Sequence, residues 1–212
     1  MQVMKWLGKF RESVERHTKR SIQNKVLDGI AVVPLGSTKA ARRDQTAWIG
    51  AAMNRLDALV DEETRNRILV DTCPHKYPKK RIREMKSRLQ GLGSIDDLLK
   101  AMRSDTSWGG GSFYDYPTRD GNVIHVTKVP YNPKTHKAAL TDEEKRRTYC
   151  HCSIVKSNME MMSPTFCCCS GGWVKQLWEG VLGIALEVKM TESILKGDKQ
   201  CTHSFEIPIS LL

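Results

Sequence analysis

The hydrophobic pattern of this chain changes character near residue 105. Before that point, apolar residues recur every three or four positions, which predicts helices over roughly residues 3–27, 38–60, 62–72, 78–90 and 94–104. After it, short alternating segments are separated by turn-forming pairs such as Asp120-Gly121. We therefore expect an α+β fold, with a mainly helical region over residues 1–105 and a C-terminal region over residues 106–212 that combines an antiparallel sheet with a short helix.

The C-terminal region has a readable order of elements. Thr148 to Lys156 is predicted to be a strand, and Gly171-Gly172 opens a short helix that runs to Leu182. Alternating apolar residues from Ile184 to Leu195 predict a strand, followed by a tight turn and a returning strand up to Ile207. Because side chains two apart on a strand share a face, Cys201, His203 and Phe205 are expected to point to one interior.

Five of the seven cysteines lie within twenty residues, between Cys150 and Cys169. Read as pairs, Cys150-x-Cys152 and Cys167-x-Cys169 offer four thiolates, which is the ligand set of a tetrahedral zinc or another soft-metal site. The usual structural zinc spacing is C-x2-C, so a buried set of small apolar cysteines with no metal is an equally open interpretation. Disulfides are not expected, because the number is odd and a chain of 212 residues does not need them.

The positive charge of the chain belongs to its first half. Residues 1–105 carry 22 Lys and Arg against 13 Asp and Glu, or +9, whereas residues 106–212 carry 12 against 11, or +1. The densest run, Lys76 to Arg88, holds seven basic residues and one acidic residue. Ile82, Met85 and Leu89 recur at helical spacing, and no aromatic residue interleaves the charges from Lys79 onward, so a solvated helix face is favoured over a grip on phosphates or on an acidic partner. Nucleic acid is not an expected partner.

The sequence also bears on location. No apolar run reaches the ~20 residues that span a bilayer, and Met1 to Phe10 is too broken by Lys5 and Lys9 for a signal-peptide core. We expect a cytoplasmic protein without a membrane partner, and a homo-oligomer is compatible with the sequence.

A glycine-rich aromatic segment spans residues 107–117. Its triple glycine is followed by neither Lys-Ser/Thr nor a helix, so no nucleotide cofactor is expected. Its aromatic residues predict either core or the wall of an apolar pocket. Trp108 and Tyr114, together with Trp173, are the candidate ligand-binding residues.

Several motifs together resemble the 4-vinyl reductase domain and the related bacterial family of L-2-amino-thiazoline-4-carboxylate hydrolase-like proteins. The shared landmarks, within about residues 70–210, are Cys73-Pro74-His75, Ser107-Trp108-Gly109-Gly110, Tyr149-Cys150-His151-Cys152, Ser163-Pro164-Thr165-Phe166-Cys167 and the segment from Glu192 to Phe205. The resemblance implies a small-molecule-binding α+β module in which cysteines hold a metal, zinc or iron, near an apolar pocket. It maps the metal ligands onto Cys152, Cys167, Cys169 and Cys201, with Cys150 and Cys73 as further candidates. Cys168 departs from the pattern and leaves the choice of ligands open.

Two functions from different classes remain open. The first is a sensor-like module that binds a small apolar or aromatic ligand beside a cysteine-rich metal or thiol site. The second is a hydrolase of a small cyclic amide or thiazoline, which uses a metal-bound water or Cys169 as nucleophile and His151 or His75 as base. The run before Trp173 precedes a predicted helix, whose dipole would lower the pKa of a thiol there.

Overall fold

The computed structural model describes residues 2–105 and 113–211. The chain forms two compact units, and each is assembled from two separate segments: unit 1 from Met1–Pro74 and Cys152–Gly172, and unit 2 from His75–His151 and Trp173–Leu212. The chain therefore passes from one unit to the other three times. The first two passages fall within the landmarks Cys73-Pro74-His75 and Tyr149-Cys150-His151-Cys152, and the third follows Gly172, shortly after the cysteine run that ends at Cys169.

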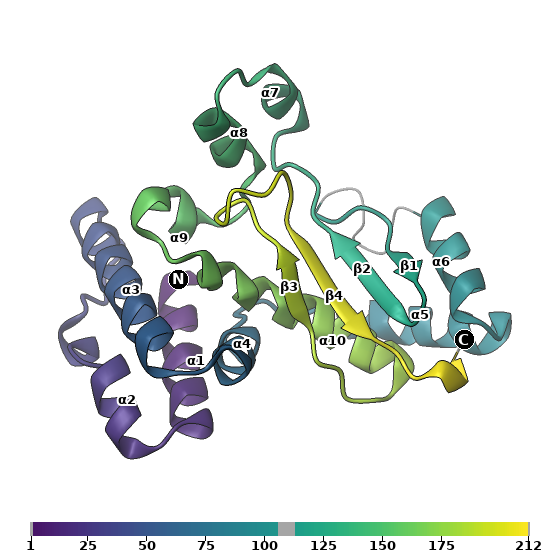
Figure 1. The fold of residues 1–212 in the computed structure, drawn as a ribbon, viewed down its shortest axis with the longest axis horizontal. Helices are drawn as coiled ribbons and strands as arrows, with labels where there is room; N and C mark the ends of the chain where they lie inside the picture. Colours follow the sequence, from purple (N-terminus) through teal and green to yellow (C-terminus); the bar gives the residue numbers. More distant parts are fainter. Residues whose placement is uncertain (1, 106–112, 212) are drawn as a thin grey trace. The chain divides into compact units, whose positions relative to one another are not determined.

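Unit 1 is helical. Its main helices are α1 (Gln2–His17), α2 (Arg20–Val26), α3 (Lys39–Leu59) and α4 (Glu62–Asp71), joined by the short α9 (Ser153–Lys156) and by the 3-10 helices η1 (Ile30–Val32), η3 (Met159–Met161) and η4 (Pro164–Ser170) (Figure 1). The side chains of Thr38 and Asp61 accept hydrogen bonds from backbone N–H groups in the first turns of α3 and α4, which satisfies donors that the helix itself cannot. Trp6 stacks on Phe10 at 4.8 Å and lies 5.1 Å from Phe166, so η4 is anchored in the aromatic core of this unit.

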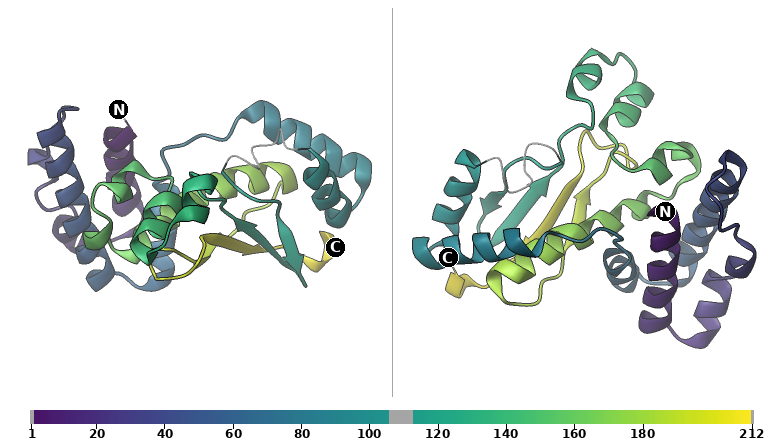
Figure 2. Two further views of the ribbon diagram at one scale, coloured as in Figure 1. Left: turned by 90° about the horizontal axis from the view of Figure 1, so that it is seen from above. Right: turned by 180° about the vertical axis from the view of Figure 1, so that it is seen from behind.

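Unit 2 is built on a four-stranded antiparallel sheet. Its strands are β1 (Thr118–Asp120), β2 (Val123–Thr127), β3 (Lys189–Glu192) and β4 (Thr202–Glu206), in the order β1-β2-β4-β3. One face of the sheet is covered by α5 (Lys79–Leu92), α6 (Ile95–Ser104) and α10 (Gly171–Leu182), as Figure 2 shows. The first two residues of α10 belong to unit 1. The α7 (Pro133–Ala138) and α8 (Asp142–Tyr149) helices pack on each other.

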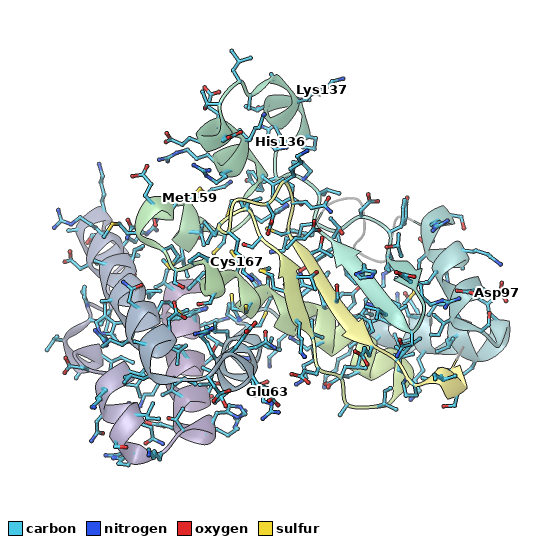
Figure 3. The ribbon with its side chains drawn as sticks, in the orientation of Figure 1. Glu63, Asp97, His136, Lys137, Met159 and Cys167 are labelled. Carbon is cyan, nitrogen blue, oxygen red and sulfur yellow. The ribbon has the colours of Figure 1, made fainter. Side chains whose placement is uncertain are left out.

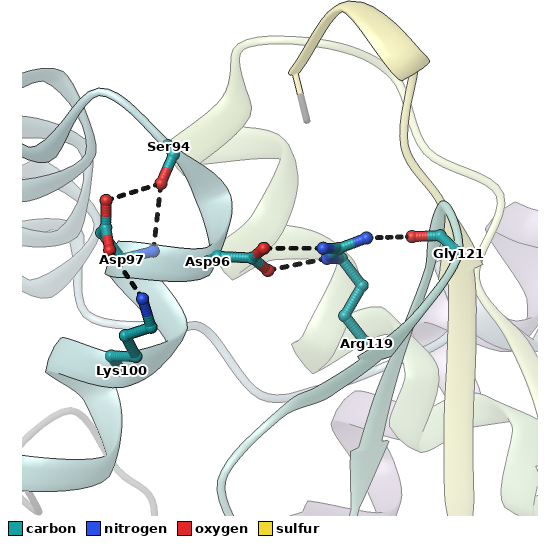
Figure 4. A network of polar contacts seen from close by, with 6 residues as sticks. All are labelled: Ser94, Asp96, Asp97, Lys100, Arg119 and Gly121. Carbon is teal, nitrogen blue, oxygen red and sulfur yellow. Dashed lines mark hydrogen bonds and ion pairs between the residues drawn. The ribbon is translucent and has the colours of Figure 1, made fainter.

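The core of unit 2 lies between the sheet and these three helices. Ile124 and Val126 of β2 and Phe205 of β4 face Trp178 of α10 and the apolar stripes of α5 and α6. Figure 4 shows how α6 is tied to the edge of the sheet: the Asp96 carboxylate accepts two hydrogen bonds from Arg119 of β1, at 2.8 and 2.7 Å, and the same guanidinium reaches the carbonyl of Gly121 in the turn. The bidentate geometry fixes the angle between helix and strand.

Most of the predicted elements are confirmed, including the α+β class. Five helical segments were expected before residue 105, and the first of them is divided into α1 and α2 around Thr18 and Lys19. The turn at Asp120-Gly121 joins β1 to β2, and the residues after Lys196 lead into β4, which pairs antiparallel with β3. The predicted strand over residues 184–195 is shortened to β3, although Leu186, Val188 and Met190 alternate as buried residues.

The predicted strand from Thr148 to Lys156 is wrong. Tyr149 is the last residue of α8, and Ser153–Lys156 is the helix α9. The reason is local: Thr141 and Glu144 form a reciprocal capping box, with three acidic residues in the first turn, and this starts a helix that runs to Tyr149. The alternation of Cys150 and Cys152 covers too few residues to oppose it.

The change of pattern at residue 105 does not coincide with a boundary between the compact units. Residue 105 falls inside unit 2, because α5 and α6 supply part of the core that covers the sheet. Among the described residues, no helix is both long and apolar enough to cross a membrane.

Candidate functional site

The aromatic side chains of unit 2 form a cluster around Trp173, at the start of α10. The Trp173 ring stacks on Tyr114, with 5.2 Å between centroids and 10° between planes, and lies 4.4 Å from Tyr77. Phe113 lies at 6.4 Å from the same indole. We call these four residues, Tyr77, Phe113, Tyr114 and Trp173, the Trp173 cluster.

The Trp173 cluster extends from the core to the surface. Tyr77 and Tyr114 are buried, whereas the Phe113 side chain is 51% exposed. On the outer side, the imidazole of His151 lies 5.4 Å from Phe113 and 5.4 Å, edge-on, from Tyr131, which is 60% exposed. Unit 2 therefore presents a row of aromatic rings that is closed at one end by core and open at the other.

Hydrogen bonds hold both sides of this row. The Gln176 side chain, one turn after Trp173, accepts from the Tyr77 N–H at 3.1 Å and donates to the His75 carbonyl at 3.0 Å. Tyr114 is held beside Lys128 by an antiparallel bridge that extends β2, and His151 Nε2 lies 2.7 Å from the Val129 carbonyl oxygen. Burial raises the pKa of Tyr77 to about 12, so its hydroxyl stays neutral at physiological pH.

Cys201 of unit 2 lies two residues before His203, whose ring approaches the Trp173 cluster. Cys201, directly before β4, and His203 of β4 are both buried, and the His203 ring is 6.3 Å from Tyr114. The Cys201 N–H donates to the Tyr149 hydroxyl at 3.1 Å, and that hydroxyl donates to the carbonyl of Lys128. Burial is the main cause that raises the pKa of Cys201, so its sulfur is a neutral thiol at pH 7 and a poor nucleophile. Burial likewise raises the pKa of Tyr149 to about 12.

The cysteine run of unit 1 is carried by η4, where Figure 3 labels Cys167. The Asp57 carboxylate of α3 positions this helix: it accepts from Ser163 Oγ at 2.5 Å and from Thr165 Oγ1 at 2.7 Å. Arg65 of α4 lies 3.4 Å from the same carboxylate. The Ser-Pro-Thr landmark is thus the anchored start of the helix that carries Cys167, Cys168 and Cys169.

The predicted metal ligands are divided between the units. Cys73, Cys152, Cys167 and Cys169 belong to unit 1, whereas Cys150 and Cys201 belong to unit 2. Across residues 2–105 and 113–211, no three side chains of His, Cys, Asp or Glu come together as ligands of a metal ion. The described geometry therefore does not supply the four-thiolate shell, and the zinc or iron site stays a prediction from the sequence.

The candidate catalytic residues are also divided. Cys169 is a half-buried residue of unit 1, two residues before the start of α10, whereas both candidate bases, His75 and His151, belong to unit 2. Burial, and then the positive charge of Lys128, lower the pKa of His75, so His75 is mainly neutral at pH 7. Of the candidate ligand-binding residues, Tyr114 and Trp173 are brought together, and Trp108 lies outside the described residues.

No family model, curated protein or solved structure matches this chain. The resemblance to the 4-vinyl reductase domain accordingly stays a prediction, and the site is interpreted from its own geometry.

Sequence reasoning missed most of the partners of Trp173. Tyr77 follows the Cys73-Pro74-His75 landmark by two residues. This closeness in sequence is the one signal that points to Tyr77 as a site residue. Gln176 carries no such signal, because only the tertiary fold brings α10 beside the start of α5. Tyr131 carries none either, because only the fold places its ring against His151. Asp57 carries no sequence signal for its contacts with Ser163 and Thr165, since an acidic residue late in a helix is ordinarily solvated.

The core between α5, α6 and α10 also encloses an apolar void. It is lined by Met85, Leu98, Met102, Leu177, Trp178 and Val181. It has no room for a molecule the size of water, so it is a gap in core packing rather than a ligand site.

Proposed function

We propose that this chain is a small-molecule-binding protein whose ligand is a small apolar or aromatic molecule. The observation that carries the proposal is the row of rings in unit 2, in which Trp173 is stacked on Tyr114 while Phe113, next to them, is 51% exposed. A planar ligand would extend this row by lying against the open rings of Phe113 and Tyr131. Aromatic pairs of this kind contribute about 0.5–1.5 kcal/mol each beyond the area they bury.

The rigidity of the row supports the proposal. Gln176 fixes the backbone on both sides of Lys76, and the Val129 carbonyl holds His151 between the two exposed rings. A surface whose side chains are already ordered loses less conformational entropy when a ligand binds. The His151 imidazole would add a polar group to an otherwise apolar surface, as expected of a ligand site.

The test is a titration with an apolar aromatic dye, anilinonaphthalene sulfonate, whose fluorescence rises in apolar sites. Phe113→Ala and Tyr131→Ala are expected to weaken dye binding by roughly fivefold each, which corresponds to about 1 kcal/mol per lost aromatic contact. Leu140→Ala is the control, because Leu140 is 91% exposed and its loss removes an exposed apolar group from another part of unit 2. Equal affinity in all four proteins would remove the proposal.

The proposal also retains a cysteine-rich metal or thiol site, as predicted from the sequence. Elemental analysis of purified wild-type protein, Cys167→Ser and Cys169→Ser tests it. About one equivalent of zinc or iron in the wild type, lost in both variants together with thermal stability, would support a structural metal, because metal affinity is part of the folding free energy. The alternative, a hydrolase with Cys169 as nucleophile, instead predicts that Cys169→Ser keeps its thermal stability and loses turnover of a small cyclic amide or thiazoline.

A further inference from the structure

The α5 helix carries a dense row of positive charge on its outward side. Met85 is buried, and Ile82 and Leu89 pack against the core of unit 2. Most of the basic residues of the segment are exposed: Lys76, Lys79, Lys80, Arg83, Lys86 and Arg88. We call the exposed residues Lys76, Lys79, Lys80, Arg83 and Lys86 the basic face.

Four of the five charges of the basic face are not neutralised locally. Glu84 is the single acidic residue of α5, and it pairs with Arg81 at 2.6 Å and with Lys80 at 3.9 Å. Within the described parts of the chain, Lys76, Lys79, Arg83 and Lys86 form no ion pair, because none of them lies within 4.0 Å of a carboxylate. A solvated helix face usually mixes both signs at i,i+4 spacing, and among the described residues of this face only the Lys80–Glu84 pair has that arrangement.

Some of the basic residues lie at the N-terminus of α5, where positive charge lowers the stability of a helix. Lys79 and Lys80 occupy the first turn of α5, which has no acidic residue and no side-chain cap. The positive end of the helix dipole lies there, so cations cost stability in that position. In contrast, α4, α6 and α8 all place acidic residues in their first turns. The first turns of α2, α3 and α7 also lack acidic residues. What distinguishes α5 is the number of its cations, because Lys79, Lys80 and Arg81 follow one another in its first turn.

The basic face is presented on a rigid support. Its first residue, Lys76, lies between the two groups that Gln176 holds, the His75 carbonyl and the Tyr77 N–H. Further along, α5 and α10 approach so closely that a Cβ added at Gly180 would lie 2.4 Å from Ile82. A helix packed this tightly cannot rotate to redistribute its charges.

We propose that the basic face of α5 binds the phosphate backbone of a nucleic acid. On α5 the basic face runs from Lys79 to Lys86, or about 10 Å at a rise of about 1.5 Å per residue, which matches roughly three phosphates of one strand at about 3.4 Å each.

Two other polyanionic partners fit the surface less well. A helix that binds a bilayer surface buries its apolar face in lipid, but the apolar side of α5 is already buried in the core. A protein interface has an apolar or aromatic centre, and the basic face offers none. Backbone phosphates need only the cations.

The experiment measures binding of the full chain to a labelled mixed-sequence DNA duplex and to its single strand, by fluorescence anisotropy over a range of salt concentrations. The triple variant Lys79→Ala/Arg83→Ala/Lys86→Ala is compared with Lys134→Ala/Lys137→Ala/Lys199→Ala, which removes the same charge from exposed positions elsewhere in unit 2. For the duplex, we expect the slope of log K against log salt to fall by about 2.7 in the first variant, because each phosphate contact contributes about 0.9.

Thermal melting separates this loss from misfolding. Removing Lys79 from the first turn of α5 is expected to leave the melting temperature unchanged or to raise it. The proposal is overturned if wild-type protein does not bind either oligonucleotide at low salt, or if both triple variants lose the same slope. Binding to polyglutamate or to anionic phospholipid vesicles as tight as that to DNA would also overturn it, since phosphate backbones would then not be preferred.

Discussion

At the scale of single residues, Gly172 shows how tightly the cysteine-bearing segments of unit 1 are packed. A Cβ at this position would lie 2.1 Å from the Val70 carbonyl oxygen and 2.5 Å from the Cβ of Cys73. Both neighbours are part of the backbone or fixed to it, so neither can move aside as a flexible side chain would. The glycine is required by close approach rather than by an unusual backbone angle.

We therefore expect Gly172→Ala to lower the free energy of unfolding by about 1–3 kcal/mol, the usual cost of overpacking. Chemical denaturation measures this change. Gly91→Ala in α5 is the matched control, because nothing lies within 4 Å of its added Cβ. The control should be neutral or stabilising by up to about 1 kcal/mol, since alanine favours a helix more than glycine does. Equal stability of the two variants would contradict the packing argument.

At the scale of elements, helices were predicted well because their signals are local. The N-cap at Thr38, the breaker Gly93 and the acidic first turn after Ser94 all stand within a few residues of the boundaries that they set. The strand predicted at residues 148–156 is wrong because a local helix signal lies just before it. The alternation of Cys150 and Cys152 favours a strand, but the capping box at Thr141, seven residues before Thr148, starts a helix that reaches Tyr149.

The link between α6 and β1 leads to a prediction about pH. Hydrogen bonds from Arg119, and its charge, hold the pKa of Asp96 below its ordinary value of 3.8. A group whose pKa is lower in the folded state stabilises the fold above the unfolded pKa, and this contribution is lost as pH falls through the folded one. The stability difference between wild type and Asp96→Asn should thus be present at neutral pH and disappear below pH 3.8.

Denaturant titrations over this pH range measure that difference. Asp120→Asn is the control: Asp120 is exposed on the same strand, β1, and forms no ion pair among the residues that the structure describes. A difference for Asp96→Asn that persists at the acid end would show that Arg119 does not act through the carboxylate charge.

At the scale of the whole molecule, the two units are discontinuous in sequence. A cut at residue 105 would remove Phe166 from the aromatic core of unit 1 and would separate α5 and α6 from the sheet of unit 2. We expect that fragments 1–105 and 106–212 each lack a cooperative thermal transition, because each has lost part of its buried apolar surface. Fragment 75–212 retains all of unit 2 and should melt cooperatively, as measured by circular dichroism. Cooperative melting of fragment 106–212 would show that the sheet does not need α5 and α6.

The sequence alone determined the local structure of this protein. Apolar spacing, caps and turn residues specify where helices and β-turns form, because these preferences depend on neighbours a few residues apart. It also singled out Tyr114 and Trp173, whose rings stack in the structure, and Cys201 and His203, which are both buried. Only the tertiary structure decided which distant side chains meet: Gln176 with Tyr77, Asp57 with Ser163, and the assignment of the cysteines to two units. Those choices depend on how whole elements pack, and no spacing within a single segment encodes them.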